Sequence, residues 1–312
     1  MSIATDNDGE LESTSLPEGR IAVADGSCIL CAQSGPFRPR GAKDGYGIEE
    51  CPACGLVQLV PTPTAETLRA LYEGESYFGG DGDTGYSQYE SQEVEYLATF
   101  REDVRRIAEF VPSGRVLEVG CGYGYFLQCA LDAGYDAYGI DLSPAAVKWA
   151  AERHPGRVFC GLLEEVPQIQ DQQYDVIFGS HLIEHLTEPG AFLETASRLL
   201  RPGGLIVLVT PNIKSLLARV SGSRWVSFKI PEHVSYYDPA TITELLSRGG
   251  FAVRATDPAY QYYALPFVAS RVRELLHPVS RLVPAVENTK LLRDRRIRVT
   301  SGSMRVIAAL TP

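Results

Sequence analysis

A glycine-rich turn between two apolar segments constrains the fold of this chain more than any other stretch. Residues 116–124 read VLEVGCGYG, an apolar run that predicts a buried strand, followed by glycines at alternate positions. An amphipathic segment comes next, and a second apolar run closes on Asp141. This order predicts a β-α-β nucleotide site, in which glycines admit a ligand close to the backbone and the acid bonds a ribose.

The glycine spacing departs from that of a dinucleotide site. In a G-x-G-x-x-G turn the pyrophosphate lies against a helix N-terminus, but here Gly124 comes one residue early and Tyr125 replaces a small residue. Glu118 lies two residues before the first glycine, where its carboxylate would repel a pyrophosphate. The same carboxylate suits S-adenosylmethionine, which has an amino group and a sulfonium, carries no phosphate and presents a ribose to Asp141. We therefore expect S-adenosylmethionine rather than NAD.

Four of the seven cysteines form two pairs, Cys28-x-x-Cys31 and Cys51-x-x-Cys54, with 19 residues between the pairs. Paired thiolates at this separation are typical of a tetrahedral zinc site, and four thiolates leave no coordination position open for chemistry. Disulfides are the alternative, which a reducing compartment disfavours. We expect a structural Zn²⁺ that supplies much of the folding free energy of a segment with little apolar core.

Four segments carry a family resemblance when they are taken in order. VLEVGCGYG, YGIDLSP, YDVIFGSHLIEHL and LRPGG resemble the successive motifs of class I S-adenosylmethionine-dependent methyltransferases, from about residue 115 to the C-terminus. The resemblance implies an antiparallel last strand, an adenine contact near Leu162 and Leu163, and a methionine contact at Ser180. With the glycine turn, the predicted cofactor contacts are Glu118, Gly120, Cys121, Gly122, Tyr123, Asp141, Leu142, Leu162, Leu163, Ser180 and Tyr86.

Apolar runs alternate with amphipathic segments beyond residue 115, which predicts a doubly wound, mainly parallel sheet. The expected fold class is α/β, a seven-stranded Rossmann-like methyltransferase fold with a small N-terminal zinc ribbon. Ser143 followed by Pro144 predicts a helix start. We expect a disordered tail over 1–22, a zinc-ribbon module over 23–62, a helical and lid connector over 63–112, and a methyltransferase domain over 113–312 with a helical insertion at about 258–298.

Two further segments have more than one interpretation. Residues 73–90 are rich in glycine and aromatic residues, so they are either an exposed linker or a lid that closes Tyr77, Tyr86 and Tyr89 over the ligands. Residues 260–286 have apolar side chains at helical spacing with interspersed arginines. Core packing or a subunit interface is expected there, and contact with lipid or a roof over the acceptor pocket are the alternatives.

An acceptor alcohol or acidic carbon must lose a proton before methylation, and histidine is the usual base. Of the five histidines, His233 lies in KIPEHVSYYDP, a loop expected at the carboxyl ends of the strands. This loop resembles the P-x-H loop of zinc-ribbon-bearing sugar methyltransferases, which implies acid–base work for Glu232 and His233. A histidine that only bonds its own loop is the alternative.

A second cluster, His181-x-x-Glu184-His185, follows the expected fourth strand. On a helix its members would share one face, so a divalent metal site is an alternative, as in some quinone-pathway O-methyltransferases. The same string marks some metalloproteases, but its place after this strand of a methyltransferase argues against that interpretation. We expect His181 to contact the acceptor.

Composition limits the partners. The net charge of −10 and the pI near 5.1 disfavour nucleic acid, whose partners usually carry a basic footprint. Residues 1–20 lack the cationic start and apolar core of a signal peptide, and no run approaches the ~18 apolar residues of a membrane span. We expect a cytoplasmic monomer or homodimer without stable membrane insertion.

The expected function is O- or C-methylation of a small molecule, either a nucleotide-linked sugar or a specialised metabolite, with His233 as general base. A quinone- or lipid-pathway O-methyltransferase that uses a divalent cation is the first alternative. An RNA base methyltransferase that binds RNA through its zinc ribbon is the second. Acidity counts against the latter, and so does Gly179-Ser180-His181-Leu182 in place of an Asn-Pro-Pro-Tyr-like sequence.

Overall fold

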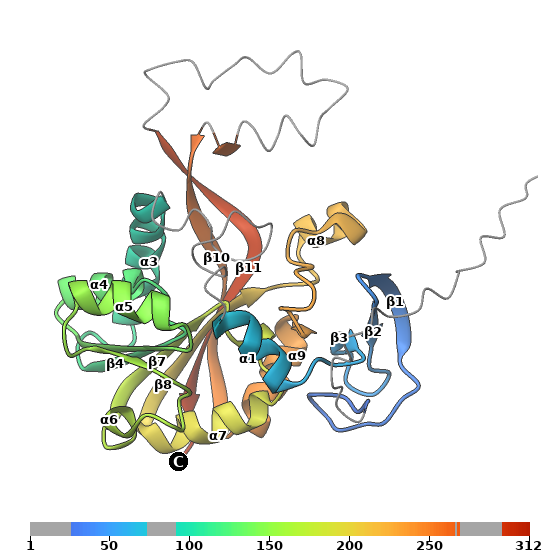
Figure 1. Cartoon of the computed structure of the whole chain (residues 1–312), viewed down its shortest axis with the longest axis horizontal. Coiled ribbons are helices and arrows are strands. Elements are labelled where there is room, and N and C mark those ends of the chain that lie inside the picture. The colour runs from blue at the N-terminus through green and yellow to red at the C-terminus, as the bar shows by residue number, and fades with distance from the viewer. Residues whose placement is uncertain (1–25, 74–91, 266, 269–294) are drawn as a thin grey trace, which may run out of the picture.

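The computed structural model describes residues 26–73, 92–265, 267–268 and 295–312. A seven-stranded sheet forms its centre, in the order β10-β11-β8-β7-β4-β5-β6 (Figure 1). Strands β4 to β8 pair in parallel, and β11 runs antiparallel to both of its neighbours. The strands are β4 (Arg115–Val119), β5 (Asp136–Asp141), β6 (Val158–Cys160), β7 (Tyr174–Ser180), β8 (Leu200–Pro211), β10 (Phe251–Ala264) and β11 (Arg296–Leu310).

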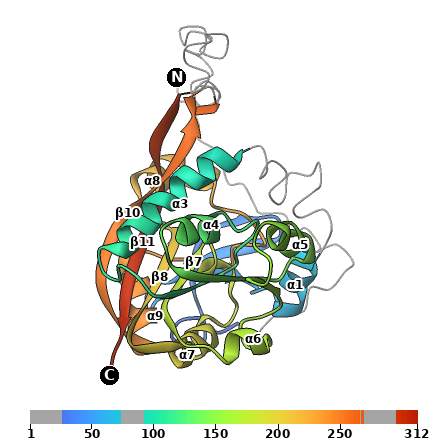
Figure 2. The same ribbon diagram turned by 90° about the vertical axis from the view of Figure 1, so that its left-hand side faces the viewer.

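Helices cover both faces of this sheet, each over its own apolar core (Figures 1 and 2). Successive side chains of β8 point to opposite faces of the sheet, as in any strand. Val207 therefore packs in one core, and Ile206 and Leu208 pack in the other. One face carries α3 (Glu93–Ala108), α4 (Tyr125–Asp132) and α5 (Pro144–Arg153), and the other carries α6 (Pro167–Gln170), α7 (Pro189–Leu199) and α9 (Pro239–Arg248).

The expected α/β fold class is therefore confirmed, including the antiparallel last strand. The helix start at Ser143 is also confirmed, because its hydroxyl accepts a hydrogen bond from the Ala146 backbone N–H. The insertion differs from expectation at both ends. Residues 258–264 continue β10 and residues 296–298 begin β11, so these parts are strand rather than helix. Most of the remaining insertion, the 1–22 tail and the lid lie outside the described residues.

The N-terminal module shares its small sheet with the methyltransferase domain. Its strands are followed in the sheet by β9, which comes from the loop after His233, in the order β1-β2-β3-β9. Leu30 and Leu56 of the module also join the core around α7 and α9. The remaining elements are β1 (Arg38–Lys43), β2 (Tyr46–Glu50), β3 (Val57–Val60), α1 (Ala65–Glu73), η2 (Ile183–His185), α8 (Leu216–Ser221), η3 (Gly222–Arg224) and β9 (Ser235–Tyr236).

Helix α3 lies across the β10–β11 pair and is fixed there by a buried ion pair (Figure 2). The Arg305 Nε of β11 donates to the Asp103 Oδ1 of α3 at 2.7 Å, and both side chains are only 4% exposed. Burial raises the pKa of Asp103 to about 6, against the opposing effect of Arg305.

No helix in the described part of the chain is long and apolar enough to cross a bilayer.

We expect Arg305→Met to lower the free energy of unfolding by about 3 kcal/mol, because it leaves the Asp103 carboxyl buried without its partner. Urea denaturation followed by circular dichroism measures this. The matched control is Arg248→Met, which removes an exposed ion pair with Glu244 and should leave the free energy of unfolding almost unchanged, because exposed ion pairs contribute little to stability. Equal losses in the two variants would show that the buried pair does not fix α3.

Candidate functional site

A cavity of about 1040 Å³ opens at the carboxyl ends of the parallel strands, where ligands bind in sheets of this kind. Its wall is built from segments that are far apart in the sequence, including α1, α3, the glycine turn and the loop with His233. Eight of the predicted cofactor contacts line it, together with both predicted histidines: Glu118, Gly120, Gly122, Asp141, Leu142, Leu162, Leu163, Ser180, His181 and His233.

The glycine turn fixes the Asp141 carboxylate. Gly122 adopts a φ of 49°, a left-handed conformation that favours glycine, and its N–H donates to Asp141 Oδ2 at 2.8 Å. The Ser143 N–H donates to Oδ1 at 2.9 Å. Each carboxylate oxygen keeps a further lone pair, so Asp141 can still accept from ribose hydroxyls.

Glu118 is the second acid on the cavity wall. It is 3% exposed, and its Oε2 accepts from the Leu127 N–H of α4 at 3.1 Å. Burial raises the pKa of Glu118 well above its usual value, and the neighbouring Asp141 adds to this. In the described part of the chain no cationic side chain pairs with Glu118, so a positively charged ligand would satisfy it. The amino group and sulfonium of S-adenosylmethionine fit this requirement.

Two predicted cofactor contacts lie elsewhere. Cys121 is buried against β5, where a Cβ on Gly139 would come within 2.9 Å of its Sγ. Tyr123 stacks on Trp149 with ring centroids 4.5 Å apart. Neither side chain lines the cavity. Tyr86 falls outside the described residues.

His181 and Glu184 form a bonded pair at the end of β7. His181 has a φ of 51°, unusual for a non-glycine residue, and such strain often accompanies function. Its Nδ1 lies 3.0 Å from Glu184 Oε1, while the Thr210 hydroxyl donates to Oε2 at 2.9 Å. Glu184 is 1% exposed. Burial would raise its pKa, but the bond to His181 outweighs this and lowers it to about 2, so Glu184 is ionised at neutral pH.

His233 and His185 form the next part of the wall. Their rings meet edge to face with centroids 4.5 Å apart. Burial lowers the pKa of His185 to about 4 and that of His233 well below its usual value, so both are neutral at pH 7. His233 Nδ1 is buried and has no hydrogen-bond partner among the described residues.

Glu232, the third predicted catalytic residue, is placed differently. Its side chain is buried and does not line the cavity, whereas His181 and His233 both do.

The His233 loop is held from two sides by one residue. The Val234 N–H donates to the Glu184 carbonyl at 2.8 Å, and the Val234 carbonyl accepts from the Leu59 N–H of β3 at 2.9 Å. Immediately after it, β9 pairs with β3, with Tyr236 opposite Val57. The N-terminal module therefore positions His233 through main-chain bonds.

The histidine cluster could also hold a divalent cation. Ligand atoms of Glu184, His185 and His233 lie within 4.8 Å of one another. This set differs from the His181, Glu184 and His185 set suggested by the sequence. Both Glu184 oxygens already accept hydrogen bonds from neighbouring side chains, which competes with metal binding.

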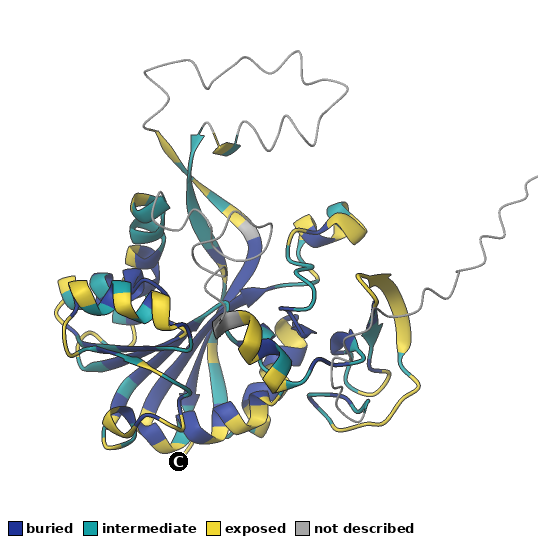
Figure 3. Cartoon of the chain, in the orientation of Figure 1, coloured by how far each residue is buried: buried dark blue, intermediate teal, exposed yellow. Residues whose placement is uncertain are grey.

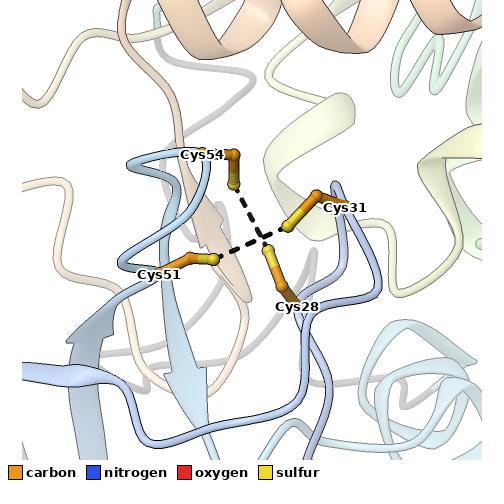
Figure 4. A group of neighbouring side chains, drawn as sticks. All are labelled: Cys28, Cys31, Cys51 and Cys54. Atoms are coloured by element: carbon orange, nitrogen blue, oxygen red, sulfur yellow. Dashed lines mark hydrogen bonds between the residues drawn. The ribbon is translucent and has the colours of Figure 1, made fainter.

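The four N-terminal cysteines converge (Figure 4). The Sγ atoms of Cys28 and Cys54 lie 3.5 Å apart, and those of Cys31 and Cys51 lie 3.6 Å apart. Tetrahedral zinc with Zn–S bonds of about 2.3 Å requires thiolates about 3.8 Å apart, so the residues fit the metal. The two cysteine turns also have similar backbone conformations. In each turn the residue after the second cysteine has a left-handed φ, 58° at Ala32 and 79° at Gly55.

Sequence reasoning missed several residues of the wall. Tyr260 and Tyr262 line the cavity from β10, and their spacing of two is a strand signal that the helical interpretation of this region obscured. Arg69 of α1 and Lys229 also line it. Nothing in the sequence places these distant residues together.

Comparison with known proteins agrees with this geometry. A family model described as a methyltransferase domain matches residues 90–256, more than half of the chain. The chain belongs to this methyltransferase family.

A Mycolicibacterium smegmatis protein named probable S-adenosylmethionine-dependent methyltransferase is 33% identical over 154 residues, 49% of this chain and 57% of that protein. The ubiquinone biosynthesis O-methyltransferase of Maricaulis maris is 27% identical over 158 residues, 45% of this chain and 60% of that protein. The chain thus spans less than two thirds of either relative.

Two solved structures share the fold of this methyltransferase. One is a chain from a complex that contains the Haloferax volcanii Trm112 methyltransferase activator, with a TM-score of 0.53, 17% identity, and coverage of 78% of this chain and 98% of that chain. The other is magnesium protoporphyrin IX methyltransferase from Synechocystis PCC 6803 with bound S-adenosylhomocysteine, with a TM-score of 0.50, 18% identity, and coverage of 80% and 100%. At this identity the likeness concerns the fold alone.

We expect Asp141→Asn to weaken S-adenosylmethionine binding by roughly tenfold or more, because an amide cannot accept as the carboxylate does from both backbone and ribose. Isothermal titration calorimetry measures this. The control is Asp132→Asn, an exposed aspartate at the end of α4, which should leave affinity unchanged. Tight binding of NAD with no response to S-adenosylmethionine would contradict the assignment of the cavity.

Proposed function

We propose that this protein transfers a methyl group from S-adenosylmethionine to a hydroxyl group or an acidic carbon of a small molecule. One observation carries the proposal: a single cavity has Glu118 and Asp141 at one part of its wall and His181 and His233 at another. The acids suit the donor, and the histidines suit the proton of an acceptor. Bound S-adenosylmethionine would supply a methyl group on a positively charged sulfur.

The residues of the chain would orient the acceptor and take its proton. Methyl transfer depends mainly on in-line alignment of acceptor, methyl group and sulfur, which a shaped cavity provides. The acceptor proton moves to a histidine, and the freed electron pair forms the new bond to the methyl carbon as the sulfur–carbon bond breaks. The donor leaves as neutral S-adenosylhomocysteine.

His181 is our choice for the general base, although the sequence pointed first to His233. The ionised Glu184 carboxylate bonds His181 Nδ1, so it orients the ring and stabilises the imidazolium that forms when the proton arrives. His233 lacks such a partner, and burial opposes its protonation. We therefore assign His233 to a neutral hydrogen bond with the acceptor, and we leave Glu232 out of the chemistry.

A nucleotide-linked sugar or similar metabolite remains the acceptor that we favour. Arg69, Arg198 and Lys229 on the cavity wall could pair with phosphates, and the tyrosines of β10 offer hydroxyls and ring faces. The second candidate is a quinone- or lipid-pathway O-methyltransferase. The Maricaulis maris relative and the Glu184, His185 and His233 group support it, and activity that requires an added divalent cation would decide for it.

We expect His181→Gln to lower kcat by about 10²-fold or more, with unchanged affinity for S-adenosylmethionine, because the base is lost while the donor site is intact. Formation of S-adenosylhomocysteine with a panel of nucleotide-linked sugars and catechols measures this. Glu184→Gln should lower kcat less and shift the acidic limb of the pH–rate profile to lower pH, since the imidazolium loses its counter-charge and the base becomes weaker.

His154→Gln is the matched control, because this buried histidine lies outside the cavity wall. It should keep full turnover once folding is confirmed by circular dichroism. His233→Gln should raise KM for the acceptor more than it lowers kcat. The opposite pattern, with turnover lost in His233→Gln and kept in His181→Gln, would transfer the role of base to His233.

We also propose that Cys28, Cys31, Cys51 and Cys54 bind one structural Zn²⁺, as the sulfur distances support. Since β3 of this module bonds the His233 loop, the metal would affect catalysis without contacting the substrate.

We expect one zinc per chain by atomic emission. Cys54→Ser should lower zinc content and turnover together while S-adenosylmethionine affinity changes little, because the glycine turn and Asp141 lie outside the module. Cys160→Ser is the control, since this cysteine is exposed on β6, and it should retain both. Full zinc content in Cys54→Ser would exclude the four-thiolate site.

A further inference from the structure

Helix α8 and the turn after it expose large apolar side chains. Leu216 and Val220 are each 78% exposed and Val226 is 70% exposed. Leu216 and Val220 are four residues apart and therefore share one side of the helix. Figure 3 shows α8 as a largely exposed segment that projects from the body of the molecule. We call Leu216, Val220, Val226, Arg219 and Arg224 the α8 patch.

The opposite side of the segment is firmly anchored. Ala218 and Trp225 are 7% and 2% exposed and pack into the core of the four-stranded sheet. Ser215 caps the helix by accepting from the Ala218 N–H at 3.1 Å, and its Oγ lies so close to Gly302 of β11 that a Cβ there would come within 2.6 Å. The exposed apolar side chains are thus presented by a packed support.

The charge of this segment is opposite to that of the whole chain. Residues 212–229 contain Lys214, Arg219, Arg224 and Lys229 and no acidic residue, whereas the chain has a net charge of −10. Arg219 and Arg224 are exposed, and neither makes an ion pair among the described residues. A short amphipathic segment with exposed aliphatic and cationic side chains is the chemistry that binds an anionic membrane surface.

We propose that the α8 patch docks this protein on the surface of a bilayer that contains anionic lipid. Leu216, Val220 and Val226 would enter the interface, while Arg219 and Arg224 pair with lipid phosphates. A second copy of the chain fits less well, because a two-fold contact would bring the same arginines against each other. A nucleic acid would leave the aliphatic side chains without a partner.

The patch reaches the functional cavity. Val226 belongs to the patch and also lines the cavity, as do the adjacent Ser227 and Lys229. Docking through α8 therefore places the rim of the cavity next to the bilayer. The docking itself does not depend on the methyl acceptor or on the proposed base.

Co-sedimentation of the full chain with vesicles tests the proposal. We expect binding to vesicles of phosphatidylcholine mixed with phosphatidylglycerol, weaker binding to phosphatidylcholine alone, and loss of binding at raised salt because screening weakens the cationic contacts. The double variants L216S/V220S and R219Q/R224Q should each reduce binding by about tenfold or more.

The matched controls are Val94→Ser and Arg105→Gln on α3, at side chains that are 50% and 67% exposed, and both should bind vesicles normally. Affinity for S-adenosylmethionine, measured by calorimetry, confirms that each variant is folded. Binding that survives both patch variants would overturn the proposal, as would a lack of binding to anionic vesicles or a dimer that only L216S/V220S dissociates. Vesicle binding and methyl transfer are measured separately, so either can fail alone.

Discussion

The arrangement of the candidate site depends on two main-chain hydrogen bonds at Val234. Its N–H bonds the Glu184 carbonyl, and its carbonyl bonds Leu59 in the N-terminal module. These bonds fix the loop that carries His233 between the segment after β7 and a strand more than a hundred residues earlier in the chain. Because backbone groups are bonded here, the placement depends on the strand β3 more than on any one side chain.

This connection gives the N-terminal module a physical role. Its sheet is completed by β9, and its apolar residues join the core around α7 and α9. Packing against that core stabilises a small segment that has little core of its own, and the proposed zinc would add to this. The segment in turn holds the loop that carries His233. The module is therefore a support for the cavity wall and is joined to it by a shared sheet.

The carboxyl groups at the two parts of the cavity have pKa values that are shifted in opposite directions. Glu118 is buried and Asp141 is half-buried, and their removal from water raises the pKa of both carboxyl groups, which suits a cationic ligand. Glu184 is also buried, but its bond to His181 outweighs the effect of burial and lowers its pKa to about 2. In the proposed reaction, the acids without a cationic partner would bind the donor, whereas the acid bonded to His181 would prepare that histidine for proton transfer.

The sequence by itself determined the β-α-β unit, the two acids Glu118 and Asp141 that line the cavity, the succession of strands and helices along the methyltransferase domain and the paired cysteines. These features are local, since strand periodicity, a glycine turn and paired cysteines are each readable within a few residues. The tertiary structure alone decided that Glu184 bonds His181, that Cys121 and Tyr123 lie off the cavity wall, and that residues 258–264 extend a strand. It also decided that β3 pairs with β9. Each of these depends on which distant segments pack together, and no local pattern carries that information.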